Sequence, residues 1–220
     1  MAPQPRQLPL DLRHVEHLSR DDLVVTPANA DAAALIDRWP DWPSSVVILA
    51  GPPGCGKSHL AAVWRDEAGA DVIDAHHLGS GVTMAGRPVL IDGIGGKPFD
   101  ESGLFHLINA VRAGNSHLLL TTRLFPGAWG VTLPDLASRL KAGTTVEIYE
   151  PDDALLMAVI AKLFADRQIE VDPSVVQYLV RRMERSLSTA ITLVERLDRA
   201  ALEGKTRISR ALAAQVLEAL

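Results

Sequence analysis

The chain has 220 residues, of which 47% are hydrophobic and 22% are charged, a composition typical of a globular protein with a sizeable core. Its formal net charge of -5 argues against broad, nonspecific DNA binding, which needs clustered lysine and arginine, although a local basic patch is compatible with this balance. The single cysteine, Cys55, excludes an internal disulfide, and the absence of long apolar runs predicts a cytoplasmic protein without a membrane span.

The first predicted elements follow a proline-rich segment. Residues 1–20 show neither helical nor strand periodicity and are expected to form a tail. Thr26 and Asn29 are candidate caps for a helix that ends near Trp39. Five apolar runs then alternate with helical patterns, at residues 46–50, 71–74, 88–91, 117–122 and 144–149. Apolar strands separated by helices are typical of a parallel sheet covered on both faces, so residues 21–150 are predicted to form an α/β domain with five parallel strands.

The pattern changes at Pro151 and is helical from there onwards. Apolar residues recur at helical spacing around 155–163, 175–180 and 191–197, and a last helical segment starts near Ser209. Residues 151–220 are therefore predicted to form a small all-helical lid domain. The Glu- and Arg-rich face between Arg181 and Arg199 is interpreted as a solvated helix face, with a partner-docking surface as the alternative.

A phosphate-binding loop lies between the first predicted strand and the next helix. The string from Gly51 to Ser58 matches the motif G-x-x-x-x-G-K-[ST]. Glycines let backbone N–H groups surround a polyphosphate, Lys57 reaches the β- and γ-oxygens, and the Ser58 hydroxyl ligates Mg²⁺. The predicted nucleotide-binding residues of this segment are Gly51, Gly54, Cys55, Gly56, Lys57, Ser58 and His59, with Cys55 a plain loop residue.

Asp92 is the second half of this predicted site. It ends the buried strand Val89–Ile91, where P-loop proteins place an acid that holds Mg²⁺. The next residue is Gly93, where a second acid that positions water would be expected in a hydrolytic enzyme. The sequence therefore predicts nucleotide and Mg²⁺ binding, with weak or no intrinsic ATP hydrolysis.

Five segments in this order and spacing resemble the AAA+ core of the replication initiator DnaA. They cover residues 21–33, 51–64, 89–94, 118–126 and 136–153. The tail carries Gln7, Leu8, Leu10 and Leu12, which resemble the sliding-clamp-binding peptide at the start of the Hda family, the DnaA-related proteins that inactivate ATP-bound DnaA. An extended peptide of this kind can place Gln7 for polar contacts while the leucines enter an apolar pocket of the partner. The chain ends after the lid, so no sequence-specific DNA binding is expected and the Hda family is the better match.

The resemblance also implies roles for several arginines. Arg139 matches the arginine finger that enters a neighbour's nucleotide site and acts there in trans. The family's sensor acid aligns with Arg123, and the lid arginine that contacts the third phosphate aligns with Ser188, which leaves Arg185 as the candidate nucleotide contact. These departures favour a protein that holds ADP or ATP as a structural part.

The expected function is regulation of replication initiation. The resemblance implies a clamp-tethered protein that stimulates hydrolysis of the ATP bound to DnaA. Self-association of the chain is also compatible with the sequence. Two alternatives are a DNA-acting loader ATPase and a small-molecule P-loop kinase. The acidic balance, Gly93 and the short segment 75–86 argue against the loader. The helical lid argues against the kinase, which needs a lid rich in phosphate-binding arginines.

Overall fold

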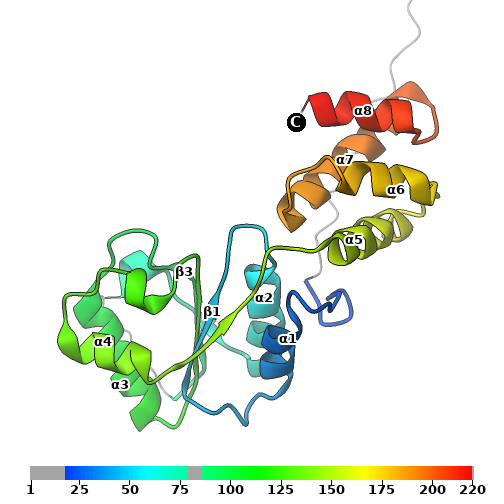
Figure 1. Cartoon of the computed structure of the whole chain (residues 1–220). Helices are drawn as coiled ribbons and strands as arrows, with labels where there is room; N and C mark the ends of the chain where they lie inside the picture. Colours follow the sequence, from blue (N-terminus) through cyan, green and yellow to red (C-terminus); the bar gives the residue numbers. More distant parts are fainter. Residues whose placement is uncertain (1–17, 79–85, 220) are drawn as a thin grey trace, which may run out of the picture.

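Five parallel strands form the centre of the computed structural model, which describes residues 18–78 and 86–219. The strands are β1 (Val46–Ala50), β2 (Asp71–Val72), β3 (Val89–Ile94), β4 (Leu118–Thr122) and β5 (Thr144–Glu147), in the spatial order β2-β3-β4-β1-β5 (Figure 1). Every neighbouring pair is parallel, which confirms the predicted sheet. β1 and β4 are buried along their whole length because helices cover both faces.

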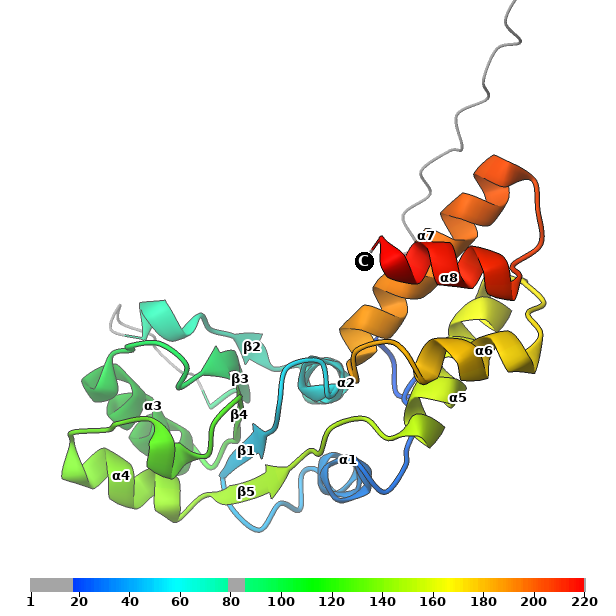
Figure 2. The ribbon, with the colours of Figure 1, turned by 45° about the horizontal axis from the view of Figure 1, so that its top comes forward.

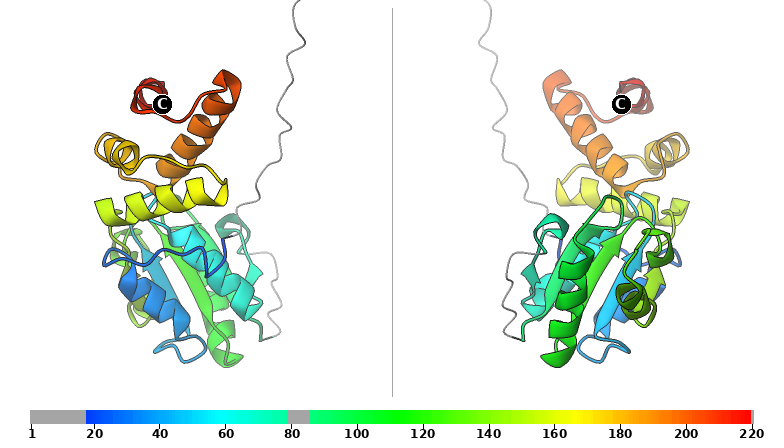
Figure 3. Two further views of the ribbon diagram at one scale, coloured as in Figure 1. Left: turned by 90° about the vertical axis from the view of Figure 1, so that its right-hand side faces the viewer. Right: turned by 90° about the vertical axis from the view of Figure 1, so that its left-hand side faces the viewer.

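The core of this domain has two layers, one on each face of the sheet. On one face lie α1 (Ala30–Asp37) and α2 (Lys57–Ala68), and on the other lie α3 (Glu101–Ala113) and α4 (Pro134–Lys141) (Figure 3). Alternation along β1 produces this division: Val47 and Leu49 pack in the cluster of α1 and α2, whereas Val46 and Ile48 pack in the cluster of α3 and α4. Two short 3₁₀ turns, at Ala75–His77 and Pro126–Ala128, complete the domain.

Four helices form the lid. They are α5 (Asp153–Asp166), α6 (Pro173–Val180), α7 (Leu187–Gly204) and α8 (Arg210–Glu218) (Figure 2). Each begins with a side-chain cap, from Asp152, Asp172, Ser186 and Ser209 respectively. Their shared core includes Leu156, Ile160, Leu179, Leu193 and Leu197, all fully buried. The predicted architecture of a parallel-sheet domain with a helical lid is thus confirmed.

Several predicted element ends were wrong. The second strand ends at Val72 rather than residue 74, and the fifth ends at Glu147 rather than residue 149. The third continues past residue 91 through a bulge at Gly93, whose φ of +91° favours glycine. Asn29 occupies the cap position of α1, but its side chain accepts from the Thr26 N–H and donates to the Val24 carbonyl, so it braces the preceding turn instead.

No helix in the described ranges, 18–78 and 86–219, is long and apolar enough to cross a membrane.

Candidate nucleotide site

The loop between β1 and α2 presents a row of free amide groups. In the described part of the chain, the backbone N–H groups of residues 54–58 donate to no protein acceptor. The last of them form the N-terminus of α2, where the helix dipole adds partial positive charge. The Lys57 ammonium folds back on the loop and donates to the carbonyls of Gly51 at 2.8 Å and Pro52 at 2.7 Å. Unpaired amides beside a lysine form an anion-binding loop suited to phosphate.

Gly54 is where the loop meets the lid. Its φ is +69°, and a Cβ placed there would collide with the Ser186 hydroxyl. The Leu187 N–H at the start of α7 donates to the Gly54 carbonyl at 2.8 Å. A glycine at this position therefore satisfies both the loop conformation and the close approach of the lid. The contact uses the carbonyl of Gly54 and leaves its N–H free.

Two side chains that could ligate a metal through oxygen, Ser58 and Asp92, lie together at the end of the loop. The Ser58 hydroxyl donates to Asp92 Oδ1 at 3.3 Å, and the Thr121 hydroxyl donates to the same carboxylate oxygen. The Gly93 N–H in turn donates to Thr121 Oγ1 at 2.8 Å, so the bulge in β3 fixes the orientation of the Thr121 hydroxyl. Among the described residues, no cluster of three or more His, Cys, Asp or Glu side chains could hold a metal. The Ser58 hydroxyl and the Asp92 carboxylate could hold Mg²⁺, whose other ligands would be phosphate oxygens and water.

A cavity of about 580 Å³ opens beside the loop, between the two domains. Of the predicted site residues, Gly54, Gly56, Lys57, Ser58 and His59 line it. The remaining walls are mostly apolar and come from the segment before α1 and from the lid: Leu18, Leu23, Val24, Leu155, Val159, Leu163, Leu187 and Ile191. A mostly apolar cavity with a polar end is the common form of a small-molecule site.

The sequence analysis missed the segment 18–24 as part of this site. The Ser19 carbonyl lies 2.9 Å from the His59 ring, and Asp22 forms an ion pair of 2.7 Å with Lys162 of α5. Lys162 also pairs with Asp166 at 2.8 Å. The Lys162 ammonium, followed by the Ser19 hydroxyl, lowers the pKa of Asp22 to about 2. Only the short apolar run Leu23–Val25 could have indicated that this segment packs on the domains.

The structure separates the two lid residues that were considered for the nucleotide. Ser188 lines the cavity, and its hydroxyl lies 2.7 Å from that of Ser186. Arg185 does not line the cavity. Its guanidinium donates to Asp153 Oδ1 at 2.6 Å and to the Pro151 carbonyl at 3.2 Å, which ties the connection between α6 and α7 to the start of the lid.

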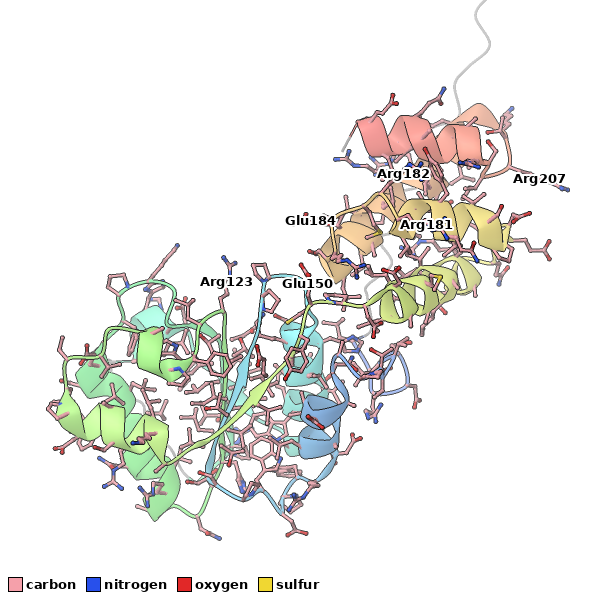
Figure 4. The ribbon with its side chains drawn as sticks, in the orientation of Figure 1. Arg123, Glu150, Arg181, Arg182, Glu184 and Arg207 are labelled. Carbon is pink, nitrogen blue, oxygen red and sulfur yellow. The ribbon has the colours of Figure 1, made fainter. Side chains whose placement is uncertain are left out.

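Arg139 and Arg123 lie outside the cavity. Arg139 is half-buried on α4, beside a surface hollow lined also by Phe105, Arg112 and Asp135. Arg123 is exposed and extends from the end of β4 (Figure 4). Neither side chain makes a hydrogen bond or ion pair with another residue in the described ranges. The tail residues Gln7, Leu8, Leu10 and Leu12 lie outside the described residues.

Comparison with solved structures defines the class of protein. Domain III of the replication initiation protein DnaA from Thermotoga maritima matches with a TM-score of 0.75 and 17% identity, over 91% of this chain and 95% of that one. The RuvB Holliday junction branch migration motor from Thermotoga maritima gives a TM-score of 0.68 and 20% identity, over 88% and 68%. AMPPCP-bound DnaA from Aquifex aeolicus gives a TM-score of 0.68 and 20% identity, over 84% and 66%. The chain therefore has the AAA+ fold.

The family is indicated by the lid. Residues 153–217 match the family model described as the Hda lid domain. The lid segment is thus similar to the Hda lid domain, and the chain as a whole shares the fold of DnaA domain III.

The Asp22–Lys162 ion pair predicts a pH-dependent contribution to stability. The folded-state pKa of Asp22 lies below its unfolded value of about 3.9, so the pair stabilises the fold at neutral pH and loses this contribution as the pH falls from about 5 to 2. Asp22→Asn should lower the free energy of unfolding at pH 7 by about 0.5–1 kcal/mol, a figure reduced for solvent screening of two partly exposed groups.

Urea unfolding of both proteins at about pH 7 and about pH 3 measures this effect, and the difference between them should shrink at the lower pH. Asp21→Asn is the matched control, because Asp21 makes no ion pair with a described residue. An equal difference at both pH values would contradict the assignment.

Proposed function

We propose that this protein binds ADP or ATP with Mg²⁺, attaches to the DNA-loaded sliding clamp by its tail, and stimulates hydrolysis of the ATP held by DnaA. It would thereby act as a negative regulator of replication initiation. The observation that carries the proposal is the Hda-type lid, at residues 153–217, on a DnaA-like fold.

The free amides of residues 54–58 support nucleotide binding. On binding, Lys57 would exchange its two loop carbonyls for phosphate oxygens, and Ser58 and Asp92 would hold Mg²⁺. Magnesium supplies charge neutralisation at the phosphates. The AMPPCP-bound structure of the Aquifex aeolicus DnaA adds support from the same fold. Ser188 lines the cavity where the family's lid arginine would be expected, so that position offers no cation for a third phosphate. The lid cations that do line the cavity, Lys162 and Arg167, are paired with carboxylates.

The protein would hydrolyse its own nucleotide slowly. Gly93 follows Asp92 where an acid would position water, and its positive φ disfavours any residue with a side chain. Two other acids line the cavity, Asp22 and Asp166, and Lys162 holds both. Each of these carboxylates is thus engaged in an ion pair instead of facing an attacking water.

Arg139 would act on the nucleotide held by DnaA. Its guanidinium has no intramolecular partner in the described chain, so docking would not require an internal ion pair to break. A planar guanidinium can donate to two phosphoryl oxygens and stabilise the charge that develops on them.

Clamp attachment is tested by changes in the tail. The double change Gln7→Ala and Leu10→Ala should weaken binding to immobilised clamp by about 30-fold or more, the loss expected for a hot-spot contact of ~2 kcal/mol. Nucleotide affinity should not change. Gln4→Ala with Val15→Ala is the matched control, since both positions flank the motif. Equal clamp affinity of the double variant and the parent would exclude this attachment site.

A further inference from the structure

Four arginines of the lid form a surface without acidic partners, which we call the arginine surface. Arg181 and Arg182 follow the end of α6, Arg207 precedes α8, and Arg210 is its first residue. All four are exposed. Figure 4 shows Arg182 between α6 and α8, and Arg207 at the outer end of the lid. In the described ranges, none of these side chains forms a hydrogen bond or ion pair.

Three other lid arginines are engaged within the protein. Arg167 contacts Asp198, Arg185 pairs with Asp153, and Arg196 donates to the Ala219 carbonyl. Exposed arginines with internal partners contribute to the fold, whereas those of the arginine surface keep their donors available. The acid nearest in sequence to Arg182, Glu184, accepts from the Thr189 hydroxyl at 3.2 Å and lies toward the α/β domain (Figure 4).

Tyr178 positions two of these arginines. The guanidinium carbon of Arg182 lies 4.2 Å from the centre of its ring, and that of Arg210 lies 4.7 Å from it. Cation–π contact with one ring holds both planar groups in place and leaves their N–H edges free. Two cations that share a ring repel each other, and neither guanidinium forms an ion pair with a carboxylate in the described chain.

The start of α8 adds to the positive potential. Arg207 and Arg210 flank Ser209, whose side chain caps the helix by accepting from the Leu212 N–H. A helix N-terminus is already partly positive, so cations there are unfavourable for stability. Local violations of such rules are found mainly at functional positions. Both the ring contact and the helix end therefore indicate that an anion completes this surface.

We infer that the arginine surface binds the phosphate backbone of duplex DNA without reading its sequence. Arginine forks match phosphate oxygens, and phosphates repeated along a duplex can meet arginines that are spread over two helices. An acidic protein partner fits less well, because protein interfaces have an apolar centre and here the aromatic ring lies against two guanidinium groups. The net charge of -5 keeps the rest of the chain unattractive to DNA.

Fluorescence anisotropy with the full chain and a labelled duplex of about 20 base pairs, lacking terminal phosphates, tests the inference. Binding should be weak, with a Kd of about 10⁻⁴–10⁻⁶ M at physiological salt, and the slope of log K against log salt should be about -3 to -4 for four phosphate contacts. The double change Arg182→Ala and Arg210→Ala should reduce the slope by about 2. Arg207 is exposed and forms no ion pair in the described chain. The single change Arg207→Ala should therefore reduce the slope by about 1 without affecting folding.

The control variant carries Arg65→Ala and Arg87→Ala. It removes the same charge from the α/β domain, where these arginines pair with Asp66 and Asp71, and its slope should equal that of the parent. Absence of binding at about 50 mM salt, or equal slopes for all variants, would overturn the inference. Tighter binding of a polyglutamate peptide than of DNA would also overturn it, in favour of an acidic protein.

Discussion

Arg139→Ala should abolish the stimulation of ATP hydrolysis on DnaA while the fold, nucleotide binding and clamp binding stay intact. An arginine finger supplied in trans accelerates hydrolysis by ~10³–10⁵-fold, so its loss should remove nearly all stimulation. Because Arg139 has no internal partner in the described chain, the change in unfolding free energy should stay within about 0.5 kcal/mol. Arg139→Lys should fail almost as completely, since an ammonium lacks the planar fork.

The assay mixes ATP-loaded DnaA, clamp on DNA and each variant, and follows conversion of ATP to ADP. Arg112→Ala is the matched control, because Arg112 lines the same surface hollow from α3. The control should stimulate like the parent. Full stimulation by Arg139→Ala would exclude the finger role and make Arg123 the next candidate.

Lys57→Ala should lose nucleotide binding. Its ammonium is the only positive side chain on the phosphate loop, and loss of a charge-assisted contact costs about 2–4 kcal/mol, roughly 30- to 1000-fold in affinity. In the parent, ADP at about 100 times its Kd should raise the free energy of unfolding by about 2.7 kcal/mol. Thermal unfolding with and without ADP and Mg²⁺ measures this gain, which should vanish in the variant.

Lys97→Ala is the control for this variant. Lys97 is an exposed lysine after β3 that makes no ion pair with a described residue, and its removal should leave the gain with ADP unchanged. Clamp binding should also be unaffected by Lys57→Ala, since the tail motif is separate from the loop. If ADP raised the free energy of unfolding of Lys57→Ala as much as that of the parent, the loop would not hold the phosphates as proposed.

The sheet was predictable because its central strands are apolar throughout. Val46–Ala50 was predicted at its observed bounds, since burial on both faces leaves no polar position in the run. The edge strands β2 and β5 were predicted too long, because an edge is paired on one side only and its ends are set by local packing. The extension of β3 depended on a bulge at Gly93, and a lone glycine in a sequence does not distinguish a bulge from a strand end.

The candidate site was predictable only where its residues are close in sequence. The phosphate loop is one contiguous motif with a distinct chemistry. Asp22 and Lys162, by contrast, are separated by 140 residues and meet only because the lid folds over the segment before α1. The same holds for Gly54 and Ser186. Such contacts depend on the relative placement of two domains, which local periodicity does not encode.

The measurement that tests the central claim most directly is the rate at which DnaA converts its bound ATP to ADP when the parent protein is added. ATP-loaded DnaA would be incubated with clamp loaded on DNA, with and without this protein and ADP. We predict an acceleration that requires both the protein and the loaded clamp, and that disappears with Arg139→Ala. A rate equal to that of DnaA alone would contradict the account.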